Sequence, residues 1–271
     1  ITHFFNPPRY MKLVEFITSK YNDESMIQEM AQFFEDILGK GVVYAKDTPN
    51  FIANRIGVYG MMVAINEAIN RKMNIEDIDA LTGTLIGRPK SATFRTADIV
   101  GLDVMTFVAD TAYNKCFDDK ERDIYILPDQ IKKLIDMGNI GQKAGAGFYK
   151  KIEKGVIHVL DLDSLEYRPI DKKKFKAISL AREHTKLADR LRAILYSDDE
   201  AGEFLWSVTS KSLLYSAHLL GQISDDILNI DHAMSWGFAW EKGPFEIWDI
   251  LGFDTVISRM KEDGLEIPVW V

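Results

Sequence analysis

The sequence predicts a mainly α-helical protein in which the end of an α/β domain precedes two copies of one helical unit. Three observations predict this fold class. Residues 1–46 combine short apolar strands with one amphipathic helix, and apolar residues then recur at helical spacing from Phe51 onward. The third observation is that residues 78–103 resemble residues 230–254.

The first 46 residues predict the order β-β-α-β. The stretches "ITHFF" and "KLVEFI" are apolar on both faces and flank Pro7 and Pro8, which is typical of two buried strands. The stretch "NDESMIQEMAQFFEDILGK" has apolar residues at helical spacing, with Asn22 or Asp23 as the N-cap and Gly39 at its end. "GVVYAK" is a third strand. We interpret this segment as the last strands of an α/β sheet whose other strands lie outside the chain.

The rest of the chain is predicted to be largely helical. Helical spacing predicts helices over residues 51–71, 75–86, 92–100, 102–115 and 128–137. A polar connector with three weak strands and a Lys-rich helix over about residues 171–190 follows the glycine-rich "GQKAGAGFYKK", and helices resume at Ala201. We therefore predict four segments, namely residues 1–48, 49–150, 151–195 and 196–271.

The internal likeness lies within the helical segments. "IDALTGTLIGRPKSATFRTADIVGLD" and "IDHAMSWGFAWEKGPFEIWDILGFD" share the leading Ile-Asp, a central Gly and Pro region, and the closing Asp-Ile-x-Gly-x-Asp. Two copies of one helical unit could bury their apolar faces on each other. The alternative is two helix-loop-helix turns that share common cap residues.

The composition is that of a globular protein, with 46% hydrophobic and 27% charged residues among 271. A net charge of −8 without a long basic stretch argues against nucleic acid and membrane surfaces as partners. The single Cys116 excludes an intramolecular disulfide, and neither a signal peptide nor a long apolar run predicts a membrane span. These features predict a cytoplasmic protein, and the start at Ile1 predicts that the chain is a fragment.

His3 is the first candidate catalytic residue. If the first two strands are neighbours, Glu15 lies across from His3, which would explain a carboxylate between Val14 and Phe16. Such a pair holds one imidazole nitrogen as a donor, leaves the other as an acceptor, and favours the imidazolium that forms when a substrate proton is taken. The alternatives are a structural histidine and a buried structural ion pair.

Two further features carry candidate site residues. Asn54 and Arg55 lie one turn into the first long helix, where the poor helix propensity of asparagine indicates a specific hydrogen bond, although capping or helix packing would explain it equally well. Lys143 lies in "GQKAGAGFY", whose glycines let the backbone approach a ligand or turn sharply. The sequence contains neither a G-x-G-x-x-G fingerprint nor Cys or His residues at metal-ligand spacing.

Four motifs, "HFFNPPRYMKLVE", "KDTPNFIANRI", "GRP...ADIVGLD" and "GQKAGAGFYKK", resemble in this order the 3-hydroxyacyl-CoA dehydrogenase family of fatty acid β-oxidation. The resemblance covers nearly the whole chain. It implies the long bacterial type, in which the C-terminal part of a Rossmann-like NAD-binding domain precedes two repeated helical C-terminal domains. It also implies that the main NAD-binding domain is absent from this chain, so that these residues alone would not reduce NAD appreciably.

By this resemblance His3 would take the hydroxyl proton of an L-3-hydroxyacyl-CoA while the C3 hydride passes to NAD, and Glu15 would orient His3. Asn54 would contact the acyl-CoA substrate, and Asn6 and Lys143 would contact the NAD cofactor. The tandem helical domains would pack on each other in place of a dimer partner, and a homodimer or a thiolase or hydratase partner stays open. The alternative function is a non-catalytic acyl-CoA-binding or assembly module.

Overall fold

The computed structural model describes the whole chain, residues 1–271. It contains two compact units. The first unit consists of Ile1–Gly57 and Ser212–Val271, and the second is Val58–Lys211. The four segments predicted from the sequence stay a prediction. None of the helices combines the length and the apolar character that a membrane crossing requires.

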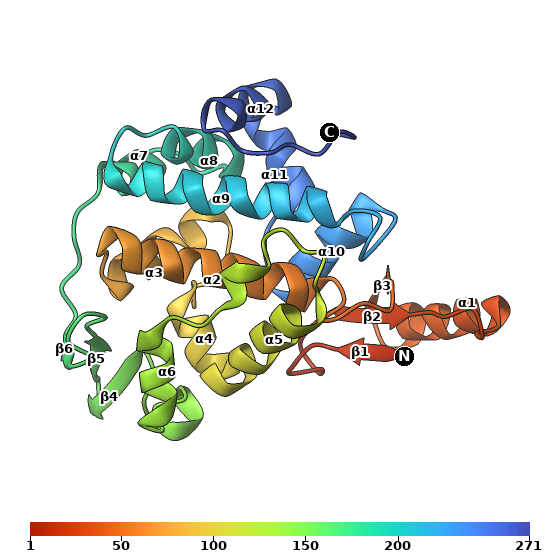
Figure 1. Cartoon of the computed structure of the whole chain (residues 1–271), viewed down its shortest axis with the longest axis horizontal. Helices are drawn as coiled ribbons and strands as arrows, with labels where there is room; N and C mark the ends of the chain where they lie inside the picture. The colour runs from red at the N-terminus through yellow and green to blue at the C-terminus, as the bar shows by residue number, and fades with distance from the viewer. The chain divides into compact units, whose positions relative to one another are not determined.

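The first unit has a three-stranded sheet with helices on both faces (Figure 1). β1 is antiparallel to β2, and β2 is parallel to β3, so α1 and η1 form the crossover of a β-α-β unit. The predicted order β-β-α-β is confirmed. The elements are β1 (Thr2–Phe4), β2 (Leu13–Ile17), α1 (Glu24–Gln32), the π-helical turn η1 (Phe33–Ile37), β3 (Gly41–Ala45), the first turn of α2 (Ala53–Arg71), the end of α9 (Glu200–Leu219), α10 (Ile227–Gly237), α11 (Pro244–Leu251) and α12 (Phe253–Glu262).

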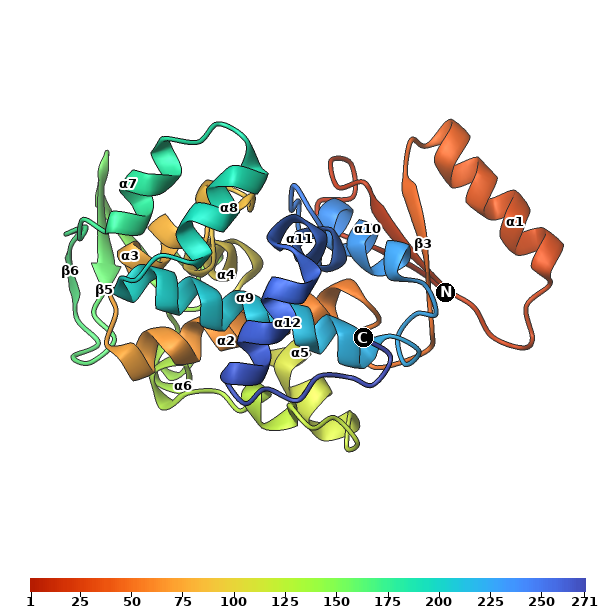
Figure 2. The same cartoon turned by 90° about the horizontal axis from the view of Figure 1, so that it is seen from above.

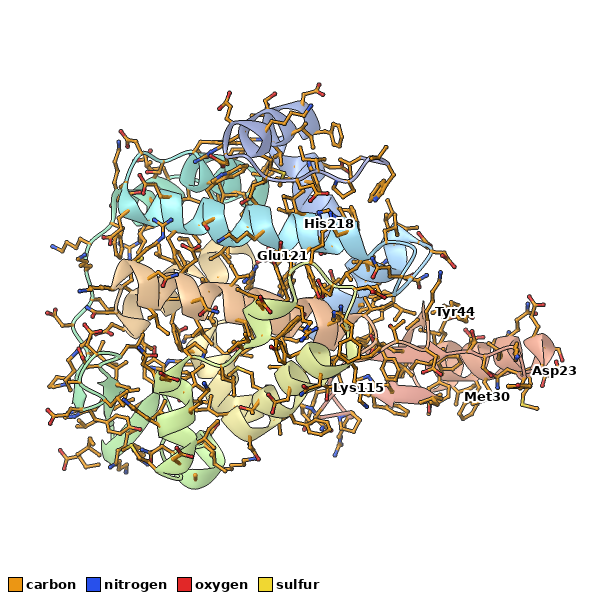
Figure 3. The ribbon with its side chains drawn as sticks, viewed as in Figure 1. Asp23, Met30, Tyr44, Lys115, Glu121 and His218 are labelled. Carbon is orange, nitrogen blue, oxygen red and sulfur yellow. The ribbon has the colours of Figure 1, made fainter.

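Local sequence explains how these elements begin and pack. Asp23 is the N-cap of α1, because its carboxylate accepts from the N–H of Ser25 at 2.8 Å and of Met26 at 3.3 Å (Figure 3). On the face of the sheet opposite α1, α10 contacts β2 and β3. A Cβ on Gly41 would lie 2.2 Å from Trp236 Cε3, so this contact requires glycine. Both faces of β2 are therefore buried, as its continuous apolar pattern predicts.

The second unit is helical apart from one small antiparallel sheet of order β4-β5-β6 (Figure 2). These three strands confirm the weak strands predicted in the connector. The elements are the rest of α2, α3 (Ile75–Leu81), η2 (Thr84–Ile86), α4 (Phe94–Val100), α5 (Leu102–Lys115), η3 (Arg122–Tyr125), α6 (Asp129–Asp136), η4 (Gln142–Ala144), β4 (Tyr149–Glu153), β5 (Val156–Leu160), β6 (Tyr167–Pro169), α7 (Lys176–Arg182), α8 (Leu187–Leu195) and the start of α9.

The single Lys-rich helix predicted over about residues 171–190 is wrong. The structure has α7 and α8 in this region, joined by a turn at residues 183–186. α7 buries only small residues, Ala177 and Ala181, whereas α8 buries Leu191 and its neighbours. Each helix therefore has its own apolar face, and one straight helix could not bury both.

The pair of repeated helical domains predicted from the likeness between residues 78–103 and 230–254 is wrong. The carboxylate of Asp79 accepts from the N–H of Phe94 at 2.7 Å, at the start of α4. The carboxylate of Asp231 accepts in the same way from the N–H of Phe245 at 2.8 Å, at the start of α11. The two aspartates therefore make the same kind of contact with free N–H groups at the start of a later helix. Residues 212–271 belong to the compact unit of the N-terminal sheet and do not form a unit of their own.

Candidate active site

The first two strands bring His3 and Glu15 together. His3 and Glu15 are directly opposite in the antiparallel register, so their side chains share one face of the sheet. His3 Nδ1 lies 2.6 Å from Glu15 Oε2. Glu15 is fully buried, whereas 30% of the His3 side chain is exposed. The predicted juxtaposition is confirmed, and the roles of the two residues stay a prediction.

The second oxygen of Glu15 holds the start of α2. Glu15 Oε1 accepts from the N–H of Ile52 at 3.0 Å and from that of Ala53 at 2.9 Å. Unpaired N–H groups and the positive end of the helix dipole both favour a carboxylate at this position. The buried charge is thereby satisfied on both oxygens. No sequence signal linked Glu15 to this helix start, because the partners are far apart along the chain.

Two aromatic rings flank the imidazole. The ring centroids of Phe5 and Phe51 lie 5.2 Å and 5.4 Å from that of His3. Phe51 has a φ of 50°, a left-handed conformation that non-glycine residues adopt uncommonly. An ionised Glu15 carboxylate can only accept, so the contact favours the tautomer with the proton on Nδ1, which leaves Nε2 as an acceptor. The sequence analysis missed this aromatic contact.

The first turn of α2 carries Asn54 and Arg55. Asn54 is half-buried and directly follows Ala53, whose N–H binds Glu15. Arg55 is buried, and its Nε donates to Tyr215 Oη on α9 at 2.6 Å. The carboxylate that holds His3 therefore also fixes the turn on which Asn54 lies. The partner Tyr215 could not be inferred from the sequence.

The two remaining predicted site residues, Asn6 and Lys143, belong to different units. Asn6 is exposed just beyond the carboxyl end of β1. Lys143 belongs to the second unit, where its Nζ lies 2.7 Å from the carboxylate of Asp103 and lowers the pKa of that carboxyl. The structure has no group of three or more His, Cys, Asp or Glu side chains that could hold a metal ion.

A partly exposed histidine paired with a buried carboxylate, next to a β-α-β unit, is compatible with proton transfer in an enzyme of the α/β class. Models of two domains match the chain: the NAD binding domain of 3-hydroxyacyl-CoA dehydrogenase over residues 1–48, and its C-terminal domain over residues 51–151. The chain belongs to the 3-hydroxyacyl-CoA dehydrogenase family of NAD-dependent oxidoreductases.

Curated relatives agree with this assignment. A probable 3-hydroxyacyl-CoA dehydrogenase of Bacillus subtilis is 48% identical over 270 residues, which is 100% of this chain and 34% of the relative. The human mitochondrial hydroxyacyl-coenzyme A dehydrogenase is 36% identical over 148 residues, covering 55% of this chain and 46% of that protein. The chain thus spans about a third of the length of the Bacillus relative.

A solved structure shows the same fold. The 3-hydroxybutyryl-CoA dehydrogenase of Escherichia coli has a TM-score of 0.64 and 17% sequence identity, and the match covers 98% of this chain and 67% of that one. At this identity the likeness concerns the fold alone.

These matches correct two expectations. The NAD-binding domain was expected to be absent, but its model matches residues 1–48, the β-β-α-β segment of the first unit, so that expectation is wrong. The C-terminal domain model matches the single stretch 51–151, which is the finding against a second, repeated helical domain. The expected packing of two tandem helical domains on each other depends on that second domain and is wrong as well. Inactivity of the chain towards NAD stays a prediction.

Proposed function

We propose that this chain serves the NAD-dependent oxidation of an L-3-hydroxyacyl-CoA to the 3-oxoacyl-CoA in fatty acid β-oxidation. The observation that carries the proposal is the 2.6 Å contact between His3 Nδ1 and Glu15 Oε2, with the imidazole partly exposed. The names of the Bacillus subtilis and human relatives support the same reaction.

His3 is the general base in this proposal. Its Nε2 accepts the proton of the C3 hydroxyl, and the imidazolium that forms is stabilised by the Glu15 carboxylate at Nδ1. Glu15 is a positioning residue, because its other oxygen is held by the N–H groups of Ile52 and Ala53. NAD, when bound, would supply the acceptor for the C3 hydride.

The residues available for NAD and substrate fit this proposal to different degrees. Asn6 suits a contact with NAD, since its amide is exposed just beyond the strand that holds His3. Lys143 suits it less directly, because its ammonium already pairs with Asp103. Asn54 suits a contact with the acyl-CoA substrate, since it follows the helix turn fixed by Glu15. A homodimer, a thiolase or hydratase partner and a cytoplasmic location stay predictions.

Replacing His3 by Gln in the full-length protein tests this function. We expect NADH formation from 3-hydroxybutyryl-CoA to fall by roughly 100-fold or more, the range of a lost general base, while acyl-CoA binding by calorimetry is kept. His184→Gln, a half-buried histidine in the turn between α7 and α8, is the matched control and should leave turnover unchanged. Unchanged turnover in His3→Gln would instead support a non-catalytic acyl-CoA-binding or assembly module.

A further inference from the structure

The second unit contains a cavity that the proposed reaction does not use. Its volume is about 610 Å³, within the range of roughly 300–1,000 Å³ of small-molecule sites. Three separate parts of the chain line it: α3 and η2, the segment around the start of α4, and the region of Tyr149 and residues 170–172. None of the candidate site residues described above lines it.

Three cations line this cavity without forming an ion pair. They are Lys90 before α4, Arg95 on α4 and Lys172 after β6. Nearby lysines of the same unit do find carboxylates: Lys173 lies 3.1 Å from Glu200, and Lys176 lies 2.6 Å from Asp198. The positive charge at the cavity is therefore left for a ligand, whereas the positive charge beside it is neutralised.

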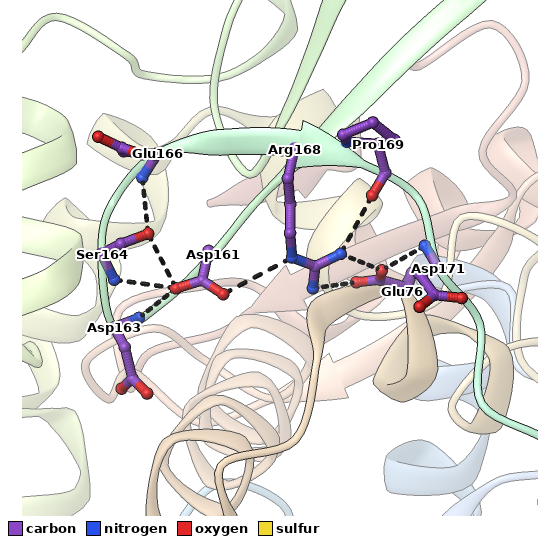
Figure 4. A network of polar contacts seen from close by, with 8 residues as sticks. All are labelled: Glu76, Asp161, Asp163, Ser164, Glu166, Arg168, Pro169 and Asp171. Atoms are coloured by element: carbon purple, nitrogen blue, oxygen red, sulfur yellow. Dashed lines mark hydrogen bonds and ion pairs between the residues drawn. The ribbon is translucent and has the colours of Figure 1, made fainter.

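The two carboxylates that line the cavity are engaged elsewhere. Glu76 is bound by the guanidinium of Arg168 at 2.7 Å and by the N–H of Asp171 at 2.9 Å (Figure 4). Asp79 accepts from the backbone N–H groups at the start of α4 and from Tyr149 Oη at 2.8 Å. With Glu76 neutralised by Arg168, the three cations outnumber the charge of Asp79, and the cavity has a net positive charge.

Arg95 is already oriented for a ligand. Its Cζ lies 4.1 Å from the centroid of the Tyr149 ring, and the Asp79 hydrogen bond fixes that ring. A stacked guanidinium loses little freedom when it binds an anion and presents a planar fork of donors that matches phosphate. Ala80 and Ile170 give the cavity apolar wall for the organic part of a ligand.

We propose that this cavity binds the phosphate groups of a small organic polyphosphate, with Lys90, Arg95 and Lys172 as the phosphate ligands. The proposal does not depend on the redox reaction, because the cavity lies wholly within the second unit and His3 lies in the first. A free nucleotide and coenzyme A share this chemistry, and the experiment separates them.

Calorimetry of the full-length protein at low salt, with ADP, coenzyme A and pyrophosphate as probes, tests the proposal. The double variant Lys90→Ala/Lys172→Ala removes two cavity cations, and Lys151→Ala/Lys174→Ala removes two exposed lysines outside the cavity as a matched control. We expect the Kd of the probe that binds most tightly to rise about tenfold or more in the first variant only, as for lost charge-assisted contacts.

Each outcome has one meaning. ADP binding more tightly than coenzyme A supports a nucleotide, and the reverse supports coenzyme A as the occupant. Failure of all three probes to bind at millimolar concentration would overturn the proposal, and so would an equal Kd in the two double variants. His3→Gln is expected to leave ADP binding unchanged. Failure of the proposed phosphate site can therefore be distinguished from failure of the proposed role of His3.

Discussion

Both units bury carboxylates, but the carboxylates have different partners. In the first unit Glu15 contacts the partly exposed imidazole of His3 with one oxygen and the start of α2 with the other. In the second unit Asp98 accepts only from backbone, the N–H groups of Phe148 and Tyr149, both at 2.8 Å. Burial raises the pKa of Asp98 to about 6 despite these hydrogen bonds.

The difference between these partners distinguishes a carboxylate with a chemical role, Glu15, from one with a structural role, Asp98. A carboxylate bound only by fixed amides joins two segments of backbone and has no group through which to act on a ligand. A carboxylate that binds a partly exposed imidazole can stabilise the charge which that imidazole gains from a substrate. The partner of the carboxylate, and not its burial, therefore points to the active site.

Among the substitutions that compare the two carboxylates, Glu15→Gln should have the largest effect on catalysis. Glu15→Gln keeps the size of the side chain but removes the charge that stabilises the imidazolium, so we expect kcat/KM to fall roughly 10- to 100-fold. The pH dependence of kcat/KM should change as well. If Glu15→Gln had the activity and the pH profile of the unsubstituted protein, Glu15 would have no chemical role that Asp98 lacks.

Asp98→Asn should show the opposite behaviour. The asparagine can accept only one of the two backbone N–H bonds, and the other N–H then faces an amide NH₂. We expect unfolding to become easier by about 1–2 kcal/mol in urea, with turnover unchanged. A loss of activity without a loss of stability would contradict a purely structural role for this residue.

The pH dependence of stability sharpens the same comparison. The pKa of Asp98 in the folded protein, about 6, exceeds its value in the unfolded protein. Between about pH 4 and pH 6, Asp98 is therefore protonated in the folded protein but ionised in the unfolded protein. The contribution of this group to stability is therefore fully present near pH 4 and is lost as the pH rises to about 6. Urea unfolding across this range should give Asp98→Asn a penalty that is largest near the acidic end and shrinks toward neutral pH. An equal penalty at every pH would refute the raised pKa.

Phe51→Leu should have the smallest effect when each change is expressed as a free energy. The leucine keeps an apolar contact but loses the ring that lies against His3, so the imidazole gains some freedom of rotation. We expect kcat to fall only a few-fold, equivalent to less than about 1 kcal/mol, with KM nearly unchanged. A change in KM alone would indicate that Phe51 contacts the substrate and does not orient His3.

Local patterns predicted much of the first unit. Stretches apolar on both faces, one amphipathic helix and turn residues predicted the β-β-α-β order, and a carboxylate inside an apolar strand required a partner such as His3. The bond from Glu15 to the start of α2 could not be foreseen, because any carboxylate in the chain could have filled that position. The hydrogen bond from the N–H of Phe148 to Asp98 could not be predicted from the sequence for the same reason.

The errors also have a physical origin. Free N–H groups at a helix start attract carboxylates in any helical protein, so the likeness around Asp79 and Asp231 does not require a repeated domain. The pairing of Lys143 with Asp103 could not be inferred from the sequence, and the contact of Lys143 with NAD stays a prediction. Charge partners of this kind depend on tertiary packing, which short sequence patterns do not encode.

The protonation of His3 tests the central claim most directly. Nitrogen-15 NMR of the labelled protein, with His3→Gln to assign the signal, reports which ring nitrogen carries the proton in the neutral imidazole. The pairing with Glu15 predicts a proton on Nδ1 and a bare Nε2, and Glu15→Gln should abolish this preference. A proton on Nε2 in the unsubstituted protein would contradict the claim, because His3 could not then accept a proton from a substrate at that nitrogen.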